Sequence, residues 1–122
     1  MNRVFQVAFH VPGTLAANLN IRWYAPFACQ LIHVSAVGSN ANDGLLTIGT
    51  SADADGYITS YSIGDSGTPV EKEAITDFNG ALAGSQYPHI ADGTIIAVAL
   101  DYDGAGGTAT DDFTLVLTFT EG

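Results

Sequence analysis

The sequence predicts an all-β fold, a single-domain antiparallel β-sandwich of jelly-roll type with about eight strands covering residues 1–122. Three observations support this prediction. Apolar and polar residues alternate near both ends of the chain, clusters of Gly, Pro, Asn and Asp separate short apolar runs, and no window has a helical period. A chain of 122 residues has room for one hydrophobic core.

The first half of the chain contains four predicted strands. Apolar and polar side chains alternate over residues 5–11, and a Pro-Gly pair ends that strand. A second alternating strand covers residues 21–25. Residues 29–37 are apolar on both faces, which predicts a central strand covered on each side. A turn cluster at residues 39–44, whose Asp-Gly end suits positive φ, precedes a fourth strand at residues 45–50.

The second half is predicted to supply the remaining strands. Residues 57–63 and 70–75 have the composition of edge strands, and residues 77–93 that of a long connection. Residues 96–102 and 113–119 alternate again and enclose a loop rich in Asp and Gly. These last two strands contain no Lys or Pro, the residues that hinder an exposed edge strand from pairing with another chain. They therefore either pair with another chain or lie inside their sheets.

The predicted core takes the apolar side of each alternating run together with the central strand. Its members are Phe5, Val7, Phe9, Ile21, Trp23, Ile32, Val34, Leu46, Ile48, Ile96, Val98, Leu100, Phe113, Leu115, Leu117 and Phe119.

The chain is acidic and sparsely charged. Charged residues make up 13% of it and the formal net charge is −10, against a usual charged fraction of ~25%. The three basic residues, Arg3, Arg22 and Lys72, form no cationic stripe, which argues against nucleic acid and membrane partners. A surface with few strongly hydrated side chains favours contact between subunits; the alternative is a monomer kept in solution by its net charge.

The single cysteine, Cys29, has no partner for an internal disulfide and lies in an apolar run, so we predict a small buried residue there. The first ten residues lack the pattern of a signal peptide. We therefore expect synthesis and assembly in a cytoplasm.

The segment Gly64–Pro69 resembles the nucleophile motif of chymotrypsin-like serine proteases, except that Thr68 stands where that family has Gly. His33 precedes it in the chain. Such enzymes need a His base, an orienting Asp and oxyanion donors held between two barrels, and this chain has about half the necessary length. Asp-Ser-Gly is also an ordinary turn sequence. We interpret Ser66 as a turn residue and predict that the protein is not an enzyme.

Two Asp-x-Asp-Gly segments, at residues 53–56 and 101–104, suggest calcium, which prefers roughly six to eight oxygen ligands. In the second segment the candidate metal ligands are Asp101, Asp103 and Asp112, spaced in part like an EF-hand loop. Strands rather than helices flank this loop, so a hairpin turn explains the same residues. No cofactor is predicted.

The histidines, His10, His33 and His89, lack the short spacings of a zinc site, and we expect hydrogen-bonded, partly buried side chains. The larger aromatic residues either pack within the sandwich or, if several emerge on one face, form a platform for stacking on sugars. They are Trp23, Tyr24, Tyr57, Tyr61, Tyr87 and Tyr102.

Three sequence segments resemble those of a known family: VPGTL at residues 11–15, APFACQLIHVSA at 25–36 and DFTLVLTF at 112–119. Through them the chain resembles the capsid decoration, or cement, proteins of tailed bacteriophages over nearly its full length. These segments are typical of strands and turns and include no catalytic signature.

The resemblance implies a viral structural protein, a β-rich module on the outside of a phage head, often a homotrimer, that clamps neighbouring subunits of the major capsid protein. It implies location in the virion after assembly in the host cytoplasm. Arg3 and Arg22 are the candidate contacts to an acidic capsid surface; solvated or internally paired arginines are the alternative. The other hypothesis is a ligand-binding sandwich, such as a carbohydrate-binding module or the receptor-binding tip of a phage fibre.

Overall fold

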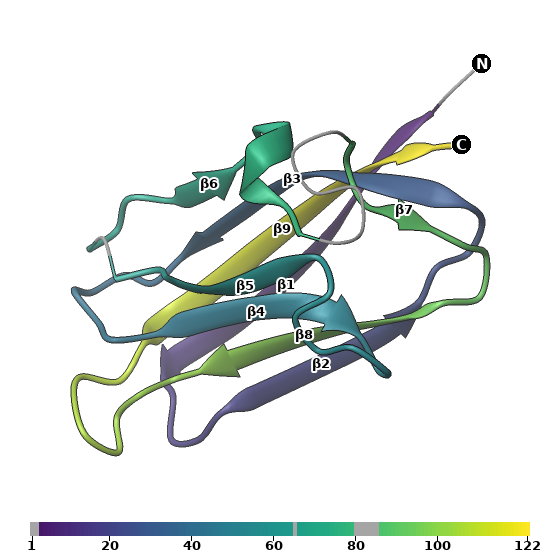
Figure 1. Ribbon diagram of the computed structural model, residues 1–122. Helices are drawn as coiled ribbons and strands as arrows, with labels where there is room; N and C mark the ends of the chain where they lie inside the picture. Colours follow the sequence, from purple (N-terminus) through teal and green to yellow (C-terminus); the bar gives the residue numbers. More distant parts are fainter. Residues whose placement is uncertain (1–2, 65, 80–85) are drawn as a thin grey trace.

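Two antiparallel sheets face each other in the computed structural model, which describes residues 3–64, 66–79 and 86–122 (Figure 1). The predicted all-β sandwich is confirmed, since the helical content of these residues is one 3-10 turn, η1 (Ile75–Asp77). The strands are β1 (Val4–Thr14), β2 (Leu19–Tyr24), β3 (Cys29–Val37), β4 (Leu45–Thr50), β5 (Ile58–Ser62), β6 (Val70–Lys72), β7 (His89–Ile90), β8 (Ile95–Asp101) and β9 (Asp111–Glu121).

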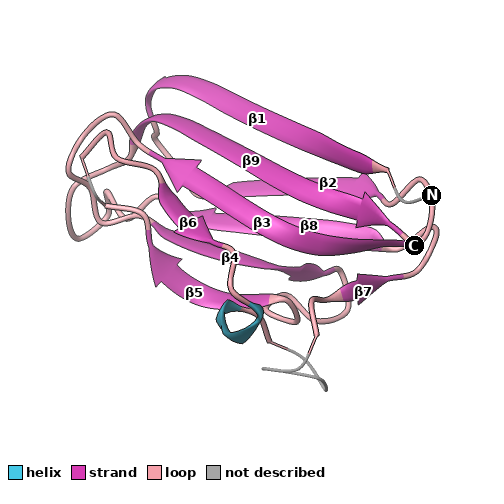
Figure 2. Cartoon of the chain, turned by 90° about the horizontal axis from the view of Figure 1, so that it is seen from above, coloured by secondary structure: helices cyan, strands magenta, loops and turns pink. Residues whose placement is uncertain are grey.

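The strand pairing is nested, and this makes the sandwich a jelly roll. β1 pairs with β9, β2 with β8, β3 with β6 and β4 with β5. Pairing of β9 with β3 and of β8 with β4 then rolls these four pairs into two sheets, ordered β1-β9-β3-β6 and β2-β8-β4-β5. The short β7 is an addition that pairs with the start of β3. Figure 2 shows the two layers with the loops gathered at their ends.

The last two strands, β8 and β9, contain no Lys or Pro and lie inside their sheets. β9 has β1 and β3 as neighbours, and β8 has β2 and β4. Neither strand can therefore pair with another chain through a free edge. The free edges belong instead to β1, β2, β5, β6 and β7.

The core lies between the two sheets and contains most of the predicted residues. Those that are buried are Val34, Leu46, Ile48, Ile96, Val98, Leu100, Phe113, Leu115, Leu117 and Phe119. Those that are partly buried and pack against them are Phe5, Val7, Phe9, Ile21 and Trp23. Cys29 is 1% exposed, which confirms its predicted burial.

Ile32 is the predicted core residue that the structure contradicts, and a β-bulge explains why. Leu31 pairs with Phe119 and His33 pairs with Thr118, so Ile32 is an extra residue in β3. Leu31 and Val34 are buried, whereas Ile32 and His33 are half-buried. The strand is therefore covered on one face only, not on both as predicted.

The loop between β3 and β4 also differs from expectation, because Gly44 does not have positive φ. Its missing side chain makes room instead, since a Cβ at Gly44 would lie 2.5 Å from the Thr110 hydroxyl oxygen. The buried Asn42 side chain accepts hydrogen bonds from the Gly44 N–H at 2.8 Å and from the Thr110 hydroxyl at 3.1 Å. This contact ties the β3–β4 loop to the loop that leads into β9.

Candidate functional site

The outer face of the β1-β9-β3-β6 sheet is built mainly from small and uncharged side chains, with charged residues at its borders. On β1, β9 and β3 the outward positions are Val4, Gln6, Ala8, His10, Thr114, Val116, Thr118, Thr120, His33, Ser35 and Val37. The Gln6 amide donates to the Thr118 hydroxyl oxygen at 3.2 Å, and His10 Nδ1 lies 2.8 Å from the Thr114 hydroxyl oxygen. A face of this kind loses less hydration free energy than a charged face when another protein covers it.

The two candidate partner contacts lie beside or on the two edge strands, β1 and β2, at one side of the sandwich. Arg3 directly precedes β1; its Nε donates to Glu121 Oε2 at 2.5 Å and its guanidinium lies 5.5 Å from the centre of the Phe27 ring. Arg22 is exposed in β2 and forms no salt bridge with any described residue. Arg3 therefore has an internal partner, whereas Arg22 is available to another molecule.

Two exposed apolar side chains accompany these arginines: Val4 is 65% exposed and Tyr24 is 68% exposed. Their chain neighbours meet in the core, because the rings of Phe5 and Trp23 lie 5.1 and 5.2 Å from the Phe119 ring. The beginning of β1 and the end of β2 are therefore at the same end of the sandwich.

We use the name β1–β2 patch for the four exposed residues at this end of the two edge strands. Val4 projects from the outer face of the larger sheet, whereas Arg22 and Tyr24 project from the outer face of the smaller one. Its members are Arg3, Val4, Arg22 and Tyr24.

The structure does not bring together the three candidate metal ligands. Asp101 Oδ1 accepts the Asp103 N–H at 3.1 Å within the β8–β9 loop, where Asp103 has a φ of 43°. Asp112 lies at the start of β9 and makes different contacts: its carboxylate accepts the Gly13 N–H at 2.7 Å and the Ser39 hydroxyl at 2.8 Å. None of the three belongs to a metal-ligating cluster within the described ranges.

These contacts make Asp112 a pH-sensitive residue. The hydrogen bond from the Gly13 N–H, assisted by the Ser39 hydroxyl and the charge of His10, lowers the pKa of the Asp112 carboxyl. A lowered pKa in the folded state adds stability above the unfolded pKa of about 3.9, and this stability is lost as pH falls through the folded pKa.

We expect Asp112→Asn to lower Tm at pH 7 and to lower it less at acid pH, as the wild-type carboxyl becomes protonated. Asn tolerates the positive φ of 48° at this position, so the substitution removes charge without backbone strain. Thermal unfolding followed by circular dichroism measures both values. The control is Asp92→Asn, at an exposed carboxylate with no described hydrogen bond; a pH-independent difference for Asp112→Asn would contradict the electrostatic explanation.

A cluster that sequence analysis did not predict lies on the outer face of the larger sheet, between β3 and β6. His33 Nε2 lies 3.7 Å from Glu71 Oε1 and 3.7 Å from Glu73 Oε2. The alternating Glu-Lys-Glu of residues 71–73 places both carboxylates on one face, but only the pairing of β3 with β6 shows that a histidine stands opposite them.

Ser66 lies in the turn between β5 and β6, as predicted, with a φ of 28°. Asp65 of the same motif lies outside the described residues. The Gly67 N–H donates to the Gly38 carbonyl oxygen at 2.9 Å, which anchors the turn to the end of β3. No hydrogen bond among the described residues joins Ser66 to a histidine, and the ionic contacts of His33 are to the two glutamates.

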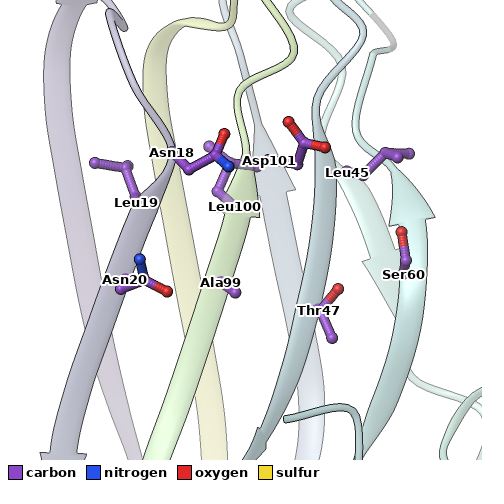
Figure 3. Close-up of a pocket in the computed structure, with 9 residues that line it drawn as sticks. All are labelled: Asn18, Leu19, Asn20, Leu45, Thr47, Ser60, Ala99, Leu100 and Asp101. Atoms are coloured by element: carbon purple, nitrogen blue, oxygen red, sulfur yellow. The ribbon is translucent and has the colours of Figure 1, made fainter.

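A shallow pocket of about 240 Å³ hollows the outer face of the β2-β8-β4-β5 sheet. Figure 3 shows that it forms over Ala99, whose small side chain stands between those of Asn20 and Thr47, with Asp101 at one end. No aromatic residue lines it. Of the six candidate stacking residues, Tyr24 alone is exposed, and the others are buried or pack against the core. The described residues therefore contain no stacking platform for sugars.

None of the described residues belongs to a helix with the length and apolar character needed to cross a bilayer. No protein-family model matches the chain, and no curated protein does.

Among solved structures, a chain of the cyanophage Pam1 capsid asymmetric unit aligns with 99% of this chain and 85% of its own length, at 14% identity and a TM-score of 0.57. The two chains share a fold. A chain of infectious bursal disease virus, Gx strain, aligns with 98% of this chain and 32% of its own length, at 15% identity. Its TM-score is 0.36, and we infer nothing from it.

Proposed function

We propose that this protein is a non-enzymatic structural component of a phage head, a decoration protein that binds the outer surface and stabilises contacts between major capsid subunits. The observation that carries the proposal is the jelly-roll likeness to a chain of the Pam1 capsid asymmetric unit, which covers 99% of this protein. The alignment also covers 85% of the Pam1 chain, so the likeness extends over most of both proteins and is not limited to one part of a larger protein.

The surface chemistry supports a binding role. The larger sheet presents a mainly uncharged outer face, and the β1–β2 patch adds an exposed tyrosine and an arginine without a described partner. Tyrosine and arginine are the side chains most enriched at the energetic centres of protein interfaces, together with tryptophan. The free edge of β1 is eleven residues long, which offers backbone groups to a neighbouring strand.

A homotrimer is the assembly that the cement-protein resemblance implies. Binding several capsid subunits at once would add avidity, so each contact can be weak. Multi-angle light scattering at tens of micromolar tests this part, with the mass of three 12.6 kDa chains as the expected result. A mass of one chain would contradict it.

The capsid location is tested on virions of the phage that encodes the chain. Mass spectrometry should detect the protein in particles purified away from free protein, and electron microscopy should place its density on the outside of the shell. Absence from the particles, or density on the tail or inside the head, would overturn the proposal.

The β1–β2 patch is the surface that we expect to contact the capsid. Tyr24→Asp should weaken binding to undecorated heads by about tenfold or more, because a charge at an interface centre must be desolvated. Arg22→Ala should weaken binding in the same assay, a sedimentation measurement with purified heads. The matched control is Ser62→Asp on the outer face of β5, the opposite edge of the same sheet, which should bind normally. Equal losses for Tyr24→Asp and Ser62→Asp would show that the patch is not the contact.

The alternative of a ligand-binding sandwich would use the pocket over Ala99. Amide, hydroxyl and carboxylate groups line it, which suits a small polar ligand, yet ligand pockets are usually larger, at roughly 300 Å³ or more, and rich in aromatic residues. Binding of a sugar that Ala99→Leu abolishes would favour this alternative over the decoration role.

A further inference from the structure

We propose that His33, Glu71 and Glu73 bind a divalent transition-metal ion, zinc in particular, on the outer face of the β1-β9-β3-β6 sheet. The ligand atoms of the three side chains all lie within 4.8 Å of one another. The cluster is at the β6 edge, the opposite edge of this sheet from β1, so the proposal is independent of the capsid contact proposed above.

The β-bulge in β3 is what turns His33 toward the glutamates. Leu31 is buried on the core side, and strict alternation would also direct His33 to the core. The extra residue, Ile32, shifts the alternation so that Val34 points inward and His33 outward. Bulges recur next to functional sites because they redirect a side chain in this way.

The register between β3 and β6 supplies the two carboxylates. Ser35 pairs with Glu71, so the alternation that exposes Ser35 also places Glu71 and Glu73 on the outer face. His33, two residues before Ser35 in the antiparallel partner, then stands beside Glu73. Both strands therefore present their ligands to the same point on the surface.

The distances fit a metal ion better than direct hydrogen bonds. The separation of 3.7 Å from His33 Nε2 to each carboxylate oxygen is too long for a hydrogen bond. Two ligand atoms each about 2.1 Å from a tetrahedral zinc are roughly 3.4 Å apart. All three ligand atoms lie within 4.8 Å of one another, and the Glu71 and Glu73 side chains are 53% and 67% exposed, so they can rotate to bring their oxygens to this spacing.

The charges of the cluster also favour a cation. Two carboxylates stand together, and the basic residues of the chain are directed elsewhere. Lys72 Nζ lies over the Tyr61 ring, 4.8 Å from its centre, and Arg3 is paired with Glu121. The imidazole nitrogen selects zinc-like ions over calcium and magnesium, which prefer all-oxygen sites. Three protein ligands leave a fourth position for water or for a donor from another molecule.

Isothermal titration calorimetry of the full chain with ZnCl₂ tests the proposal. We expect one zinc per chain, and at least about tenfold weaker binding for His33→Gln, Glu71→Gln and Glu73→Gln, since even outer-shell partners of a metal contribute this much. His10→Gln and Glu121→Gln are the matched controls, a histidine and a glutamate on the same sheet outside the cluster, and they should bind like wild type. CaCl₂ in excess should not displace the zinc.

Absence of zinc binding by the wild-type chain would overturn the proposal and leave His33 as an ion-pair partner of the glutamates. Wild-type affinity in all three cluster variants would also overturn it, because the zinc would then be held elsewhere, at His89 or in an Asp loop. Far-UV circular dichroism establishes that each variant is folded. If one of the variants is unfolded, the glutamate variants that do fold test the site. The NMR signals of the wild-type His33 ring, which should shift when zinc is added, test it independently.

Discussion

Leu115→Asp should abolish folding of the protein. Leu115 lies in the middle of β9, is 0% exposed, and is paired with Phe9 on one side and Ala36 on the other. A carboxylate there would be buried without a partner, at a cost of several kcal/mol. Domains of this kind are stable by only about 5–15 kcal/mol, so most of the stability would be lost. The soluble fraction on expression and the far-UV circular dichroism spectrum measure the outcome.

Ala8→Asp is the matched control. Ala8 neighbours Phe9 in β1 but points outward and is exposed, so the same charge stays in water. We expect a soluble, folded protein with nearly wild-type Tm. Thr118 would be a poor control although it also faces outward, because Gln6 and the adjacent strands cover it to 8% exposure. Equal solubility of Leu115→Asp and Ala8→Asp would show that the register of β9 is wrong.

Phe119→Ala should lower the free energy of unfolding by about 3–5 kcal/mol, the usual cost of removing a fully buried aromatic ring. Phe119 is 0% exposed and connects the two sheets. Its ring stacks on Phe5 at 5.1 Å, with an interplanar angle of 16°, and meets Trp23 edge-on at 5.2 Å. The cavity would therefore open between β1, β2 and β9, the strands that carry the β1–β2 patch.

Urea denaturation followed by tryptophan fluorescence measures this loss, since Trp23 is the single tryptophan and touches the altered site. Phe27→Ala is the control: this half-buried ring meets Phe5 edge-on at 5.2 Å, and we expect a loss of about 1 kcal/mol. If Phe27→Ala costs as much as Phe119→Ala, Phe119 is not the centre of the core.

Local patterns were enough to predict most of the strands. Residues 29–37 and 45–50 are strands with the predicted bounds, because apolar runs and turn clusters mark both ends of each. Between residues 51 and 93 the structure departs from the prediction in two places. There the expected strand at 70–75 is shortened to Val70–Lys72, and the expected long connection contains the two-residue β7. Such short elements are stabilised by pairing with β3 and have no pattern of their own.

The candidate surfaces depend on pairing between distant strands, so alternation alone does not predict them. The bulge at Ile32 changes which way His33 points, and no residue in the sequence marks it. Arg3 and Arg22 could be proposed as contacts from composition, but their places beside the edge strands of the two sheets follow from the jelly-roll order. The Asp candidates show the opposite case: Asp101 and Asp112 are near in sequence, yet Asp101 is hydrogen-bonded within the β8–β9 loop, whereas Asp112 is hydrogen-bonded to β1 and to the β3–β4 loop.

The central position of β9 has a consequence for how the protein is made. β9 joins β1 to β3, so the larger sheet is divided until residues 111–121 are present. On the ribosome β1 therefore has no partner in its sheet, and its apolar side stays uncovered, until β9 has been translated. Pairing across so many residues closes long loops and is slow, which exposes the nascent chain to aggregation and to chaperones. Ribosome-bound chains stalled before residue 111 should consequently remain protease-sensitive, with the cooperative unit forming only after β9 has been released.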